Sequence, residues 1–248
     1  MSTERTRGTR RVTDLLLEDA SFTLFAYVLL ALYAREMISF LWLQAALVVY
    51  VIRVFNLRHE RAHLPLRAER PWLYAVSNLL EVYHLPIQEP FSEKRTKHLM
   101  HHKAHSSAKA IGAAENPHAL LDTSFWQAFF VSAFYHEVMF AMDLAAGRIT
   151  KQRIEMIAVS TAAIALTVWL VGWKAFLLFV LAYRVASFIA WFTFSYVLHT
   201  KPFYEKEIGP LLPRPFKKVT EWVLGSGTVT AIFYHRHHHT RPSVYFRF

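Results

Sequence analysis

Residues 154–199 read IEMIAVSTAAIALTVWLVGWKAFLLFVLAYRVASFIAWFTFSYVLH. This stretch contains two apolar runs, at 154–171 and 175–199, which only the short segment 172–174 separates. Each run approaches or exceeds the ~20 residues that an α-helix needs to cross a bilayer. A glycine at the break favours a tight turn. The sequence therefore predicts a transmembrane hairpin here.

Two further apolar runs lie near the N-terminus, at residues 22–34 and 37–55, and only Arg35 and Glu36 separate them. They predict a first hairpin, although both are slightly short for a span. A cleaved signal peptide is the alternative for the first run, because the start of the chain is basic and the run ends on small residues. The second run, which follows almost at once, favours a retained span.

These patterns predict an all-α integral membrane protein that forms one domain over residues 1–248. Its four transmembrane helices form two hairpins, and a cytoplasmic cap of interfacial helices carries the histidine-rich segments. The predicted spans are about residues 21–35, 37–55, 154–172 and 175–199, after a basic tail at residues 1–20.

The charge distribution predicts the orientation of the chain. Lys and Arg total 28 against 18 Asp and Glu, a net charge of +10, and they concentrate outside the two short hairpin tips. The positive-inside rule therefore places both termini and the cap in the cytoplasm, with the spans in the cytoplasmic (inner) membrane. The excess charge also suits an anionic membrane surface or an acidic partner protein. No nucleic-acid-binding motif is present, so nucleic acid is not expected as a partner.

Histidine and cysteine usage narrow the chemistry. The chain has no cysteine, which excludes disulfides, iron–sulfur ligation and thiolate catalysis. It has 14 histidines, and most of them lie in three short stretches: HERAH at 59–63, HLMHH at 98–102 and HRHHH at 235–239. A metal would therefore be bound by imidazole, carboxylate or amide groups.

The spacing inside these three boxes is helical. Positions i, i+3 and i+4 lie on one face of a helix, so each box presents two or three imidazoles on one stripe, with His237 on a different face. The eight candidate ligands are His59, His63, His98, His101, His102, His235, His238 and His239. His105 lies one turn beyond the second box. The alternative, a set of solvated or headgroup-binding histidines, is retained for His84, His118 and His136.

The boxes can form one site only if an even number of spans separates them. Residues 154–199 supply two, so the apolar segment 124–145 should be interfacial or buried and not spanning. Its polar residues His136, Glu137 and Asp143 agree with that. Amphipathic patterns predict further interfacial helices at 71–83 and 216–224.

Eight imidazoles exceed the three or four ligands that one zinc ion takes, so they indicate two metals. Imidazole binds Zn, Cu, Fe and Ni, so the ligand type alone does not identify the metal. A pair of metals at the ends of membrane spans suits O₂ activation beside a hydrocarbon chain. The alternatives are a membrane zinc hydrolase and a metal transporter, although transporters place their ion sites near the bilayer midplane.

The order HxxxH, HxxHH, HxxHH resembles the membrane fatty-acid desaturase superfamily of histidine-box diiron enzymes, which includes alkane hydroxylases and carotenoid ketolases. The resemblance extends over about residues 22–239. It implies a ninth metal ligand at the end of the fourth span, where this chain has His199. The family has an Asn four residues earlier, and this chain has Ser195 there, a poorer ligand that we leave out of the metal set.

The resemblance also implies the reaction. Two iron ions, with O₂ as co-substrate, would oxidise an unactivated C–H bond of a lipid or acyl chain. Desaturation is favoured by the box spacing, and hydroxylation or ketolation is the alternative. No haem or flavin domain is present, so electrons are expected from an external donor such as a ferredoxin or rubredoxin.

Other residues are candidates for supporting roles. Carboxylates that orient metal-bound imidazoles would come from Glu60, Glu81, Glu137 or Asp143. A basic face for an acidic donor, or alternatively for lipid headgroups, would comprise Lys94, Arg95, Lys97, Lys103, Lys109, Arg214, Lys217 and Lys218. Arg184 lies near the middle of the fourth span, where a charge is costly. It would either bind a substrate carboxylate or pair with a buried polar group, and we expect the second.

Overall fold

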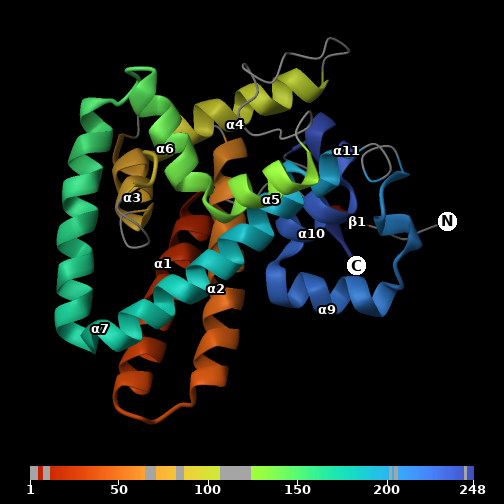
Figure 1. The fold of residues 1–248 in the computed structure, drawn as a ribbon. Coiled ribbons are helices and arrows are strands. Elements are labelled where there is room, and N and C mark those ends of the chain that lie inside the picture. The colour runs from red at the N-terminus through yellow and green to blue at the C-terminus, as the bar shows by residue number, and fades with distance from the viewer. Residues whose placement is uncertain are drawn as a thin grey trace.

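The computed structural model is built almost entirely from helices (Figure 1). It describes residues 5–7, 12–64, 71–81, 87–106, 124–200, 203, 206–242 and 245–248. His84, Lys109, His118 and the side chain of His105 lie outside this described part. The helices are α1 (Val12–Ala34), α2 (Phe40–His63), α3 (Pro71–Glu81), α4 (Phe91–Ser106), α5 (Phe125–Ala133), α6 (Tyr135–Ala145), α7 (Lys151–Ser195), α9 (Arg214–Leu224), α10 (Ser226–Phe233) and α11 (His235–Thr240), with 3₁₀ turns η1 (Val197–His199) and η2 (Gly209–Leu211).

Three helical segments are long and apolar enough to cross a membrane: α1, α2 and Lys151–His199. The third is broken at Gly172, whose φ of 82° and ψ of 154° are not helical. Figure 1 shows the two parts of α7 leaving this break in different directions. The break lies in the predicted turn at 172–174, because a residue without a Cβ adopts positive φ at little cost.

The segment 124–145 is not one straight helix. It forms α5 and α6, which are bent by 90° at their junction and together make a fourth candidate for a broken span or a re-entrant loop. Ser124 caps α5 by accepting a hydrogen bond from the backbone of Gln127, whose side chain accepts in return from the backbone of Ser124. This bent geometry fits the polar side chains that the sequence places in the segment.

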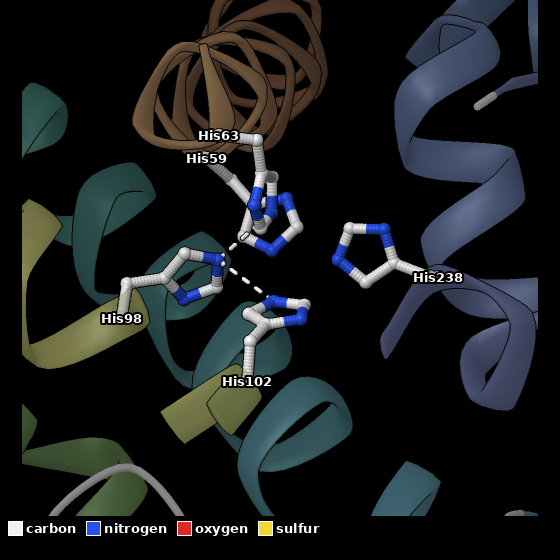
Figure 2. Close-up of side chains that lie close together, drawn as sticks. All are labelled: His59, His63, His98, His102 and His238. Atoms are coloured by element: carbon white, nitrogen blue, oxygen red, sulfur yellow. Dashed lines mark hydrogen bonds between the residues drawn. The ribbon is translucent and has the colours of Figure 1, made fainter. Parts of the chain in front are cut away.

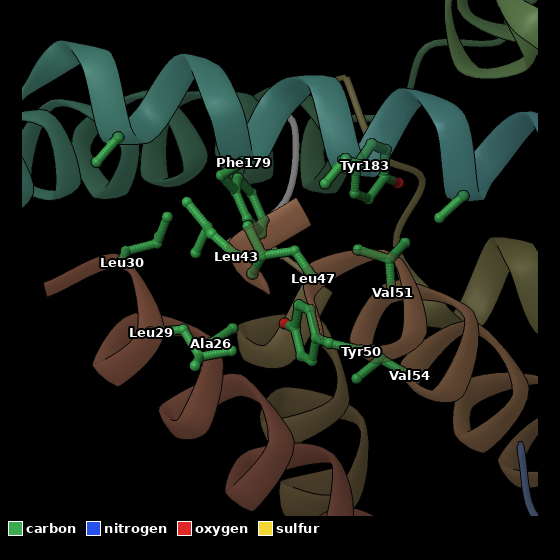
Figure 3. Close-up of a cluster of buried hydrophobic side chains, with 13 residues drawn as sticks. Ala26, Leu29, Leu30, Leu43, Leu47, Tyr50, Val51, Val54, Phe179 and Tyr183 are labelled. Carbon is green, nitrogen blue, oxygen red and sulfur yellow. The ribbon is translucent and has the colours of Figure 1, made fainter. Parts of the chain in front are cut away.

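The core of the helical bundle lies where α1, α2 and the second part of α7 meet (Figure 3). Leu43 and Leu47 of α2 are fully buried between Leu30 of α1 and Phe179 and Ala182 of α7. The opposite helix faces expose large apolar side chains, such as Trp42 at 75% and Trp169 at 79%. Exposed apolar surface of this kind marks contact with a membrane or a partner.

Helix α1 begins well before the apolar run that predicted it. The basic tail was expected to extend through residue 20, but the chain is helical from Val12. Leu15, Leu16 and Asp19 are buried, and Asp19 accepts hydrogen bonds from Arg58 and Arg61 of α2. These long-range contacts extend the helix beyond its hydrophobic segment.

Two short strands join the ends of the chain, which the sequence did not predict. Strand β1 (Arg5–Arg7) pairs antiparallel with β2 (Tyr245–Arg247), with Arg5 opposite Arg247. Figure 1 accordingly shows the N- and C-terminal ends on the same side of the molecule. Because the two strands are hydrogen-bonded to each other, both ends must lie on one side of any bilayer that the helices cross.

The two helices predicted at 71–83 and 216–224 are present as α3 and α9. Helix α9 starts with Pro215 in its first turn, and its exposed face carries Phe216, Val219 and Trp222. The cations Arg214 and Lys218 are also exposed on this helix. An apolar face flanked by cations is typical of a helix that lies in the headgroup region of a membrane.

Candidate metal centre

The first histidine box is the C-terminal end of α2. The helix begins at Ser39, whose hydroxyl accepts from the Trp42 backbone, and continues past its apolar part to end at His63. His59 and His63 are one turn apart and therefore share a face of the helix. The polar last turns of α2 thus carry two imidazoles out of the hydrophobic bundle.

The other two boxes lie on two separate helices. Helix α4 carries His98, His101 and His102, and α11 carries the third box. Tyr234, with φ −129° and ψ 52°, separates α10 from α11 and reorients the chain just before this box. The boxes therefore approach one another from three separate elements.

Five imidazoles from these elements form one group (Figure 2). His59 and His63 come from α2, His98 and His102 from α4, and His238 from α11. One ring nitrogen of each lies within 4.8 Å of the corresponding nitrogens of the other four. The Nε2 atoms of His63 and His98 are 2.9 Å apart, and those of His98 and His102 are 3.1 Å apart. We call these residues the five-histidine group.

A second group lies beside the first. His101, His199 and His239 bring ring nitrogens within 4.8 Å of one another. His235 adjoins them, because its Nε2 is 3.3 Å from Nε2 of His199 and 3.1 Å from Nε2 of His239. We call these four residues the four-histidine group. The rings of His102 and His239, one from each group, have centroids only 4.5 Å apart.

The structure thus brings all nine histidines that the sequence singled out into two adjacent groups, while His237 does not join them. The ring of His237 lies against Phe246, and its backbone N–H donates to Glu207. His136 is also separate, with its Nε2 3.2 Å from the hydroxyl of Tyr183. The face of α11 that carries positions i, i+3 and i+4 of the third box therefore points toward the two histidine groups.

The spacing and burial of these rings fit metal ions. Imidazole nitrogens lie about 2.0–2.1 Å from a bound zinc ion, so neighbouring ligands of an ion of that size are about 3.0–3.4 Å apart. The observed nitrogen–nitrogen separations of 2.9–3.3 Å overlap this range. His238 is buried, and neither of its ring nitrogens has a hydrogen-bond partner among the described residues. A buried polar group of this kind is costly unless a ligand binds it.

The surroundings of three imidazoles favour the neutral form that binds metals. Burial, followed by the neighbouring imidazoles, lowers the pKa of His98, His238 and His239 well below the ordinary histidine value. The neutral ring, with one free lone pair, is the form that ligates a metal. For His235 the tautomer follows from geometry, because Nδ1 lies 2.8 Å from the Ala231 carbonyl, which can only accept. Nδ1 therefore carries the hydrogen, and Nε2 faces the four-histidine group as an acceptor.

Both groups, except for His63, line a cavity of about 70 Å³. The rest of its wall is formed by the apolar side chains of Phe55, Ala62, Trp191 and Phe194, by the cations Arg58 and Lys94, and by the buried side chain of Ser195. The site therefore combines nitrogen ligands with a surface that suits a hydrocarbon. Ser195 stands one turn before His199, at the edge of the four-histidine group.

The carboxylates that were expected to orient imidazoles have other partners. Glu81 accepts from Arg58 at 3.0 Å and from Lys94 at 2.9 Å. Burial alone would raise the pKa of Glu81, but these two cations lower it to about 2 and keep it ionised. Asp143 pairs with Lys97 and Arg153 at 3.0 and 2.7 Å. Both carboxylates therefore hold cap elements together, and the backbone carbonyl of Ala231 orients the imidazole of His235.

The remaining two candidates also make contacts away from the imidazoles. Glu137 forms an ion pair with Arg184 of α7, so this charge is paired, although with a half-buried carboxylate and not with a buried polar group. The side chain of Glu60 is buried against α10, where its carboxyl group occupies the space next to Gly227.

The basic face predicted for an acidic donor is only partly available. Lys94 and Lys97 are in ion pairs with buried carboxylates, Arg95 donates to the Leu64 carbonyl, and Lys217 is buried beside Gly209 and Tyr234. Because ion pairs or hydrogen bonds hold these four side chains, they do not form a continuous docking face. Lys103, Arg214 and Lys218 are exposed.

Replacing Gly227 by alanine is expected to disturb the third box. A Cβ at this position would overlap the carboxyl group of Glu60, which α2 holds one residue after His59. Overpacking of this kind costs about 1–3 kcal/mol, and here it would push α10, and with it α11, away from α2. We expect a lower unfolding temperature and reduced bound metal, measured by a thermal melt and by elemental analysis. Ser226→Ala adds no atoms and removes only the hydrogen bond from Ser226 to Glu221, so bound metal should be unchanged. Equal loss of metal in both variants would contradict the overlap argument.

A family model described as fatty acid desaturase matches residues 37–247 of the chain. This range includes all three histidine boxes and the 172–174 turn. Neither a curated protein nor a solved structure matches the chain significantly.

Proposed function

The chain belongs to the fatty acid desaturase family, and on this basis we propose that it is an O₂-dependent diiron membrane enzyme that oxidises an unactivated C–H bond of a lipid-like aliphatic chain. The family membership indicates a membrane oxidoreductase of the desaturase and hydroxylase type. Within that class we propose desaturation as the main reaction, with hydroxylation or ketolation as the alternative.

The observation that carries this proposal is the division of nine imidazoles, six buried and three half-buried, into two adjacent groups beside a largely apolar cavity. Five and four nitrogen ligands each suit one iron ion, and the nine candidate ligands are His59, His63, His98, His101, His102, His199, His235, His238 and His239. When bound and reduced, two iron ions supply the activation of O₂ that removes hydrogen from a methylene group. A zinc hydrolase or a transporter would not need nine imidazoles for two ions.

The chain itself would hold, orient and shield the reacting groups. The hydrogen bond from His235 to Ala231 fixes one imidazole, and the others are carried by α2, α4, α11 and the 3₁₀ turn η1. Phe55, Trp191 and Phe194 form an apolar wall that would exclude water and guide an aliphatic chain past the metals. Ser195 would leave its edge of the site more open than the family's Asn does.

We propose four membrane crossings, formed by α1, α2 and the two parts of α7. The pairing of β1 with β2 supports an even number, because it keeps the two ends of the chain on one side. The break at Gly172 supports counting α7 twice. The excess of Lys and Arg outside the hairpin tips supports a cytoplasmic location for both termini and the metal centre, in the cytoplasmic (inner) membrane.

A reporter fused after Phe248 and another inserted at Gly172 are expected to lie on opposite sides of the membrane. Alkaline phosphatase activity should appear only for the Gly172 insertion, and green fluorescence only for the fusion after Phe248. If both positions gave the same signal, four crossings with a cytoplasmic metal centre would be wrong.

The reaction is tested with purified protein, an external ferredoxin-type or rubredoxin-type donor, and candidate lipids under labelled O₂. We expect two irons per chain and a product lighter by two hydrogens, both measured by mass spectrometry. Labelled oxygen in the product would favour the hydroxylase alternative. Turnover that persists without O₂ and reductant, in a protein that retains zinc, would contradict the oxidase proposal and support a hydrolase.

The donor is proposed to be a separate acidic protein. Lys103 on α4 is exposed directly after the second box, and Arg236 is exposed in the third. Both lie within one residue of candidate ligands, so a donor attracted to them would approach the metals closely. Attraction of this kind raises the rate of association and weakens with salt.

A further inference from the structure

Helix α9 has an outer face that combines positive charge with apolar rings. Arg214, Lys218 and Trp222 are each four residues apart, so they form one stripe along the helix, and all three are exposed. The apolar side chains of Phe216 and Val219 are exposed beside this stripe, and Trp222 itself is 87% exposed. Neither cation forms an ion pair with a carboxylate in the described part of the chain. The outer face therefore carries two positive charges that the protein does not neutralise.

The inner face of α9 is bound to the segment that carries the third histidine box. Lys217 is buried, and its ammonium group donates to the Gly209 carbonyl at 3.2 Å and to the Tyr234 hydroxyl at 3.3 Å. Tyr234 is the residue directly before that box. The carboxylate of Glu221 accepts from the backbone N–H of Phe248 at 3.1 Å, which ties α9 to the C-terminal strand as well. Because these contacts fix its inner face, α9 and the start of α11 should move together.

The level of α9 along α2 corresponds to the surface of a bilayer. Gly225 ends α9 with φ 91° and ψ 154°, and a Cβ at this position would overlap the guanidinium group of Arg53. Arg53 lies near the end of the apolar run 37–55 that forms the membrane-crossing part of α2. Figure 1 shows α9 lying crosswise beside α2. A helix at this level lies where the acyl chains meet the headgroups.

The composition of the outer face fits an anionic lipid surface. Tryptophan is enriched at the boundary between acyl chains and headgroups, and Trp222 ends the exposed stripe. Cations next to an apolar face attract anionic headgroups, while the apolar side chains insert below them. A soluble acidic protein would complement Arg214 and Lys218, but it would meet the apolar side chains at the edge of the hydrocarbon region. The observations therefore favour a lipid partner.

We propose that α9 binds the headgroups of anionic phospholipids, and that this binding holds the third histidine box in position. Phosphate groups would accept hydrogen bonds from Arg214 and Lys218, and Trp222 would insert beside them. Lys217 would transmit the position of α9 to Tyr234, so that release of the helix from the lipid would loosen the start of α11. The lipid here is a structural partner and not the substrate, so the inference goes beyond the proposed function.

Lipid selectivity at α9 is the first measurement. Because the chain has no cysteine, Val219→Cys provides a single attachment point for a fluorescent label on the outer face. The labelled protein is reconstituted in bilayers in which either phosphatidylglycerol or phosphatidylcholine carries brominated chains, which quench the label on contact. Each cation near an anionic surface strengthens binding about fivefold, so phosphatidylglycerol is expected to bind beside the label about 25-fold more strongly than phosphatidylcholine.

Lys218→Gln and Lys151→Gln are the matched variants for this measurement. Each removes one exposed cation, the first from α9 and the second from the start of α7. We expect Lys218→Gln to reduce the selectivity about fivefold and Lys151→Gln to leave it unchanged. Equal quenching by the two lipids in protein without either variant would overturn the inference. So would a label that soluble iodide quenches and brominated lipids do not, because α9 would then face water and a soluble partner.

Iron retention is the second measurement, and it tests the link to the third box. Iron-loaded protein without reductant is exposed to a chelator, and iron loss is expected to be several-fold slower in bilayers that contain phosphatidylglycerol than in phosphatidylcholine alone. Lys217→Met, which removes the hydrogen bond to Tyr234, should abolish this difference and keep the lipid selectivity. Selective lipid binding with identical iron loss in the two bilayers would overturn the link. Neither measurement requires turnover, so failure of the proposed reaction would be seen separately.

Discussion

His238→Ala is expected to abolish activity and to remove most of the bound iron. His238 is the sole contribution of α11 to the five-histidine group, whose other members come from α2 and α4 (Figure 2). Its ring is buried without a hydrogen-bond partner among the described residues, so binding a metal is the role its surroundings allow. Iron per chain, measured by mass spectrometry of purified protein, should fall by at least one.

His237→Ala is the control, since it removes an imidazole from the neighbouring position on the same helix. The ring of His237 lies against Phe246 and outside both groups, so this variant should keep its iron and most of its activity. If His237→Ala lost as much iron as His238→Ala, the orientation of α11 would have to be different.

The fold class could be predicted because its signals are local. The apolar runs and the glycine at position 172 are visible in the sequence, and the break in α7 falls at that glycine. The early start of α1 could not be predicted in this way. It depends on Asp19 meeting Arg58 and Arg61, which are 39 and 42 residues away in the chain. The pairing of β1 with β2 joins the two ends of the chain and leaves no local pattern.

The candidate site shows the same limit. Helical spacing singled out the stripe of each box, and the family match confirms the resemblance that the spacing indicated. Helical spacing could not show which histidines belong to which group. Helix α4 contributes His98 and His102 to the five-histidine group and His101 to the four-histidine group. Nor could local charge show that Lys94 and Lys97 pair with buried carboxylates. Such partners depend on how distant segments pack.

Asp19→Ala is expected to destabilise the protein by about 3–5 kcal/mol, because it removes the carboxylate that pairs with the buried Arg61 and leaves Arg58 with Glu81 alone. Asp19 is fully buried and accepts from Arg61 at 3.0 Å and from Arg58 at 3.3 Å, and the side chain of Arg61 is equally inaccessible. Neither guanidinium can lose its charge at accessible pH. The loss should appear as a lower unfolding midpoint in a chemical denaturation series in detergent, and iron should be released earlier, since the same turns of α2 carry His59 and His63.

Glu18→Ala is the control, because it also removes an ion pair between α1 and α2, but a partly exposed one. Glu18 is the preceding residue and also pairs with an arginine of α2, but both partners keep some exposure, with side chains 21% and 13% accessible for Glu18 and Arg53. Arg53 can extend toward water or lipid headgroups when its partner is removed, so the cost should be no more than about 1 kcal/mol. Similar midpoints for the two variants would show that the Asp19 network is not a buried anchor between α1 and α2. A large loss for Asp19→Ala alone would show that this anchor, which no hydropathy pattern reveals, holds the first histidine box in place.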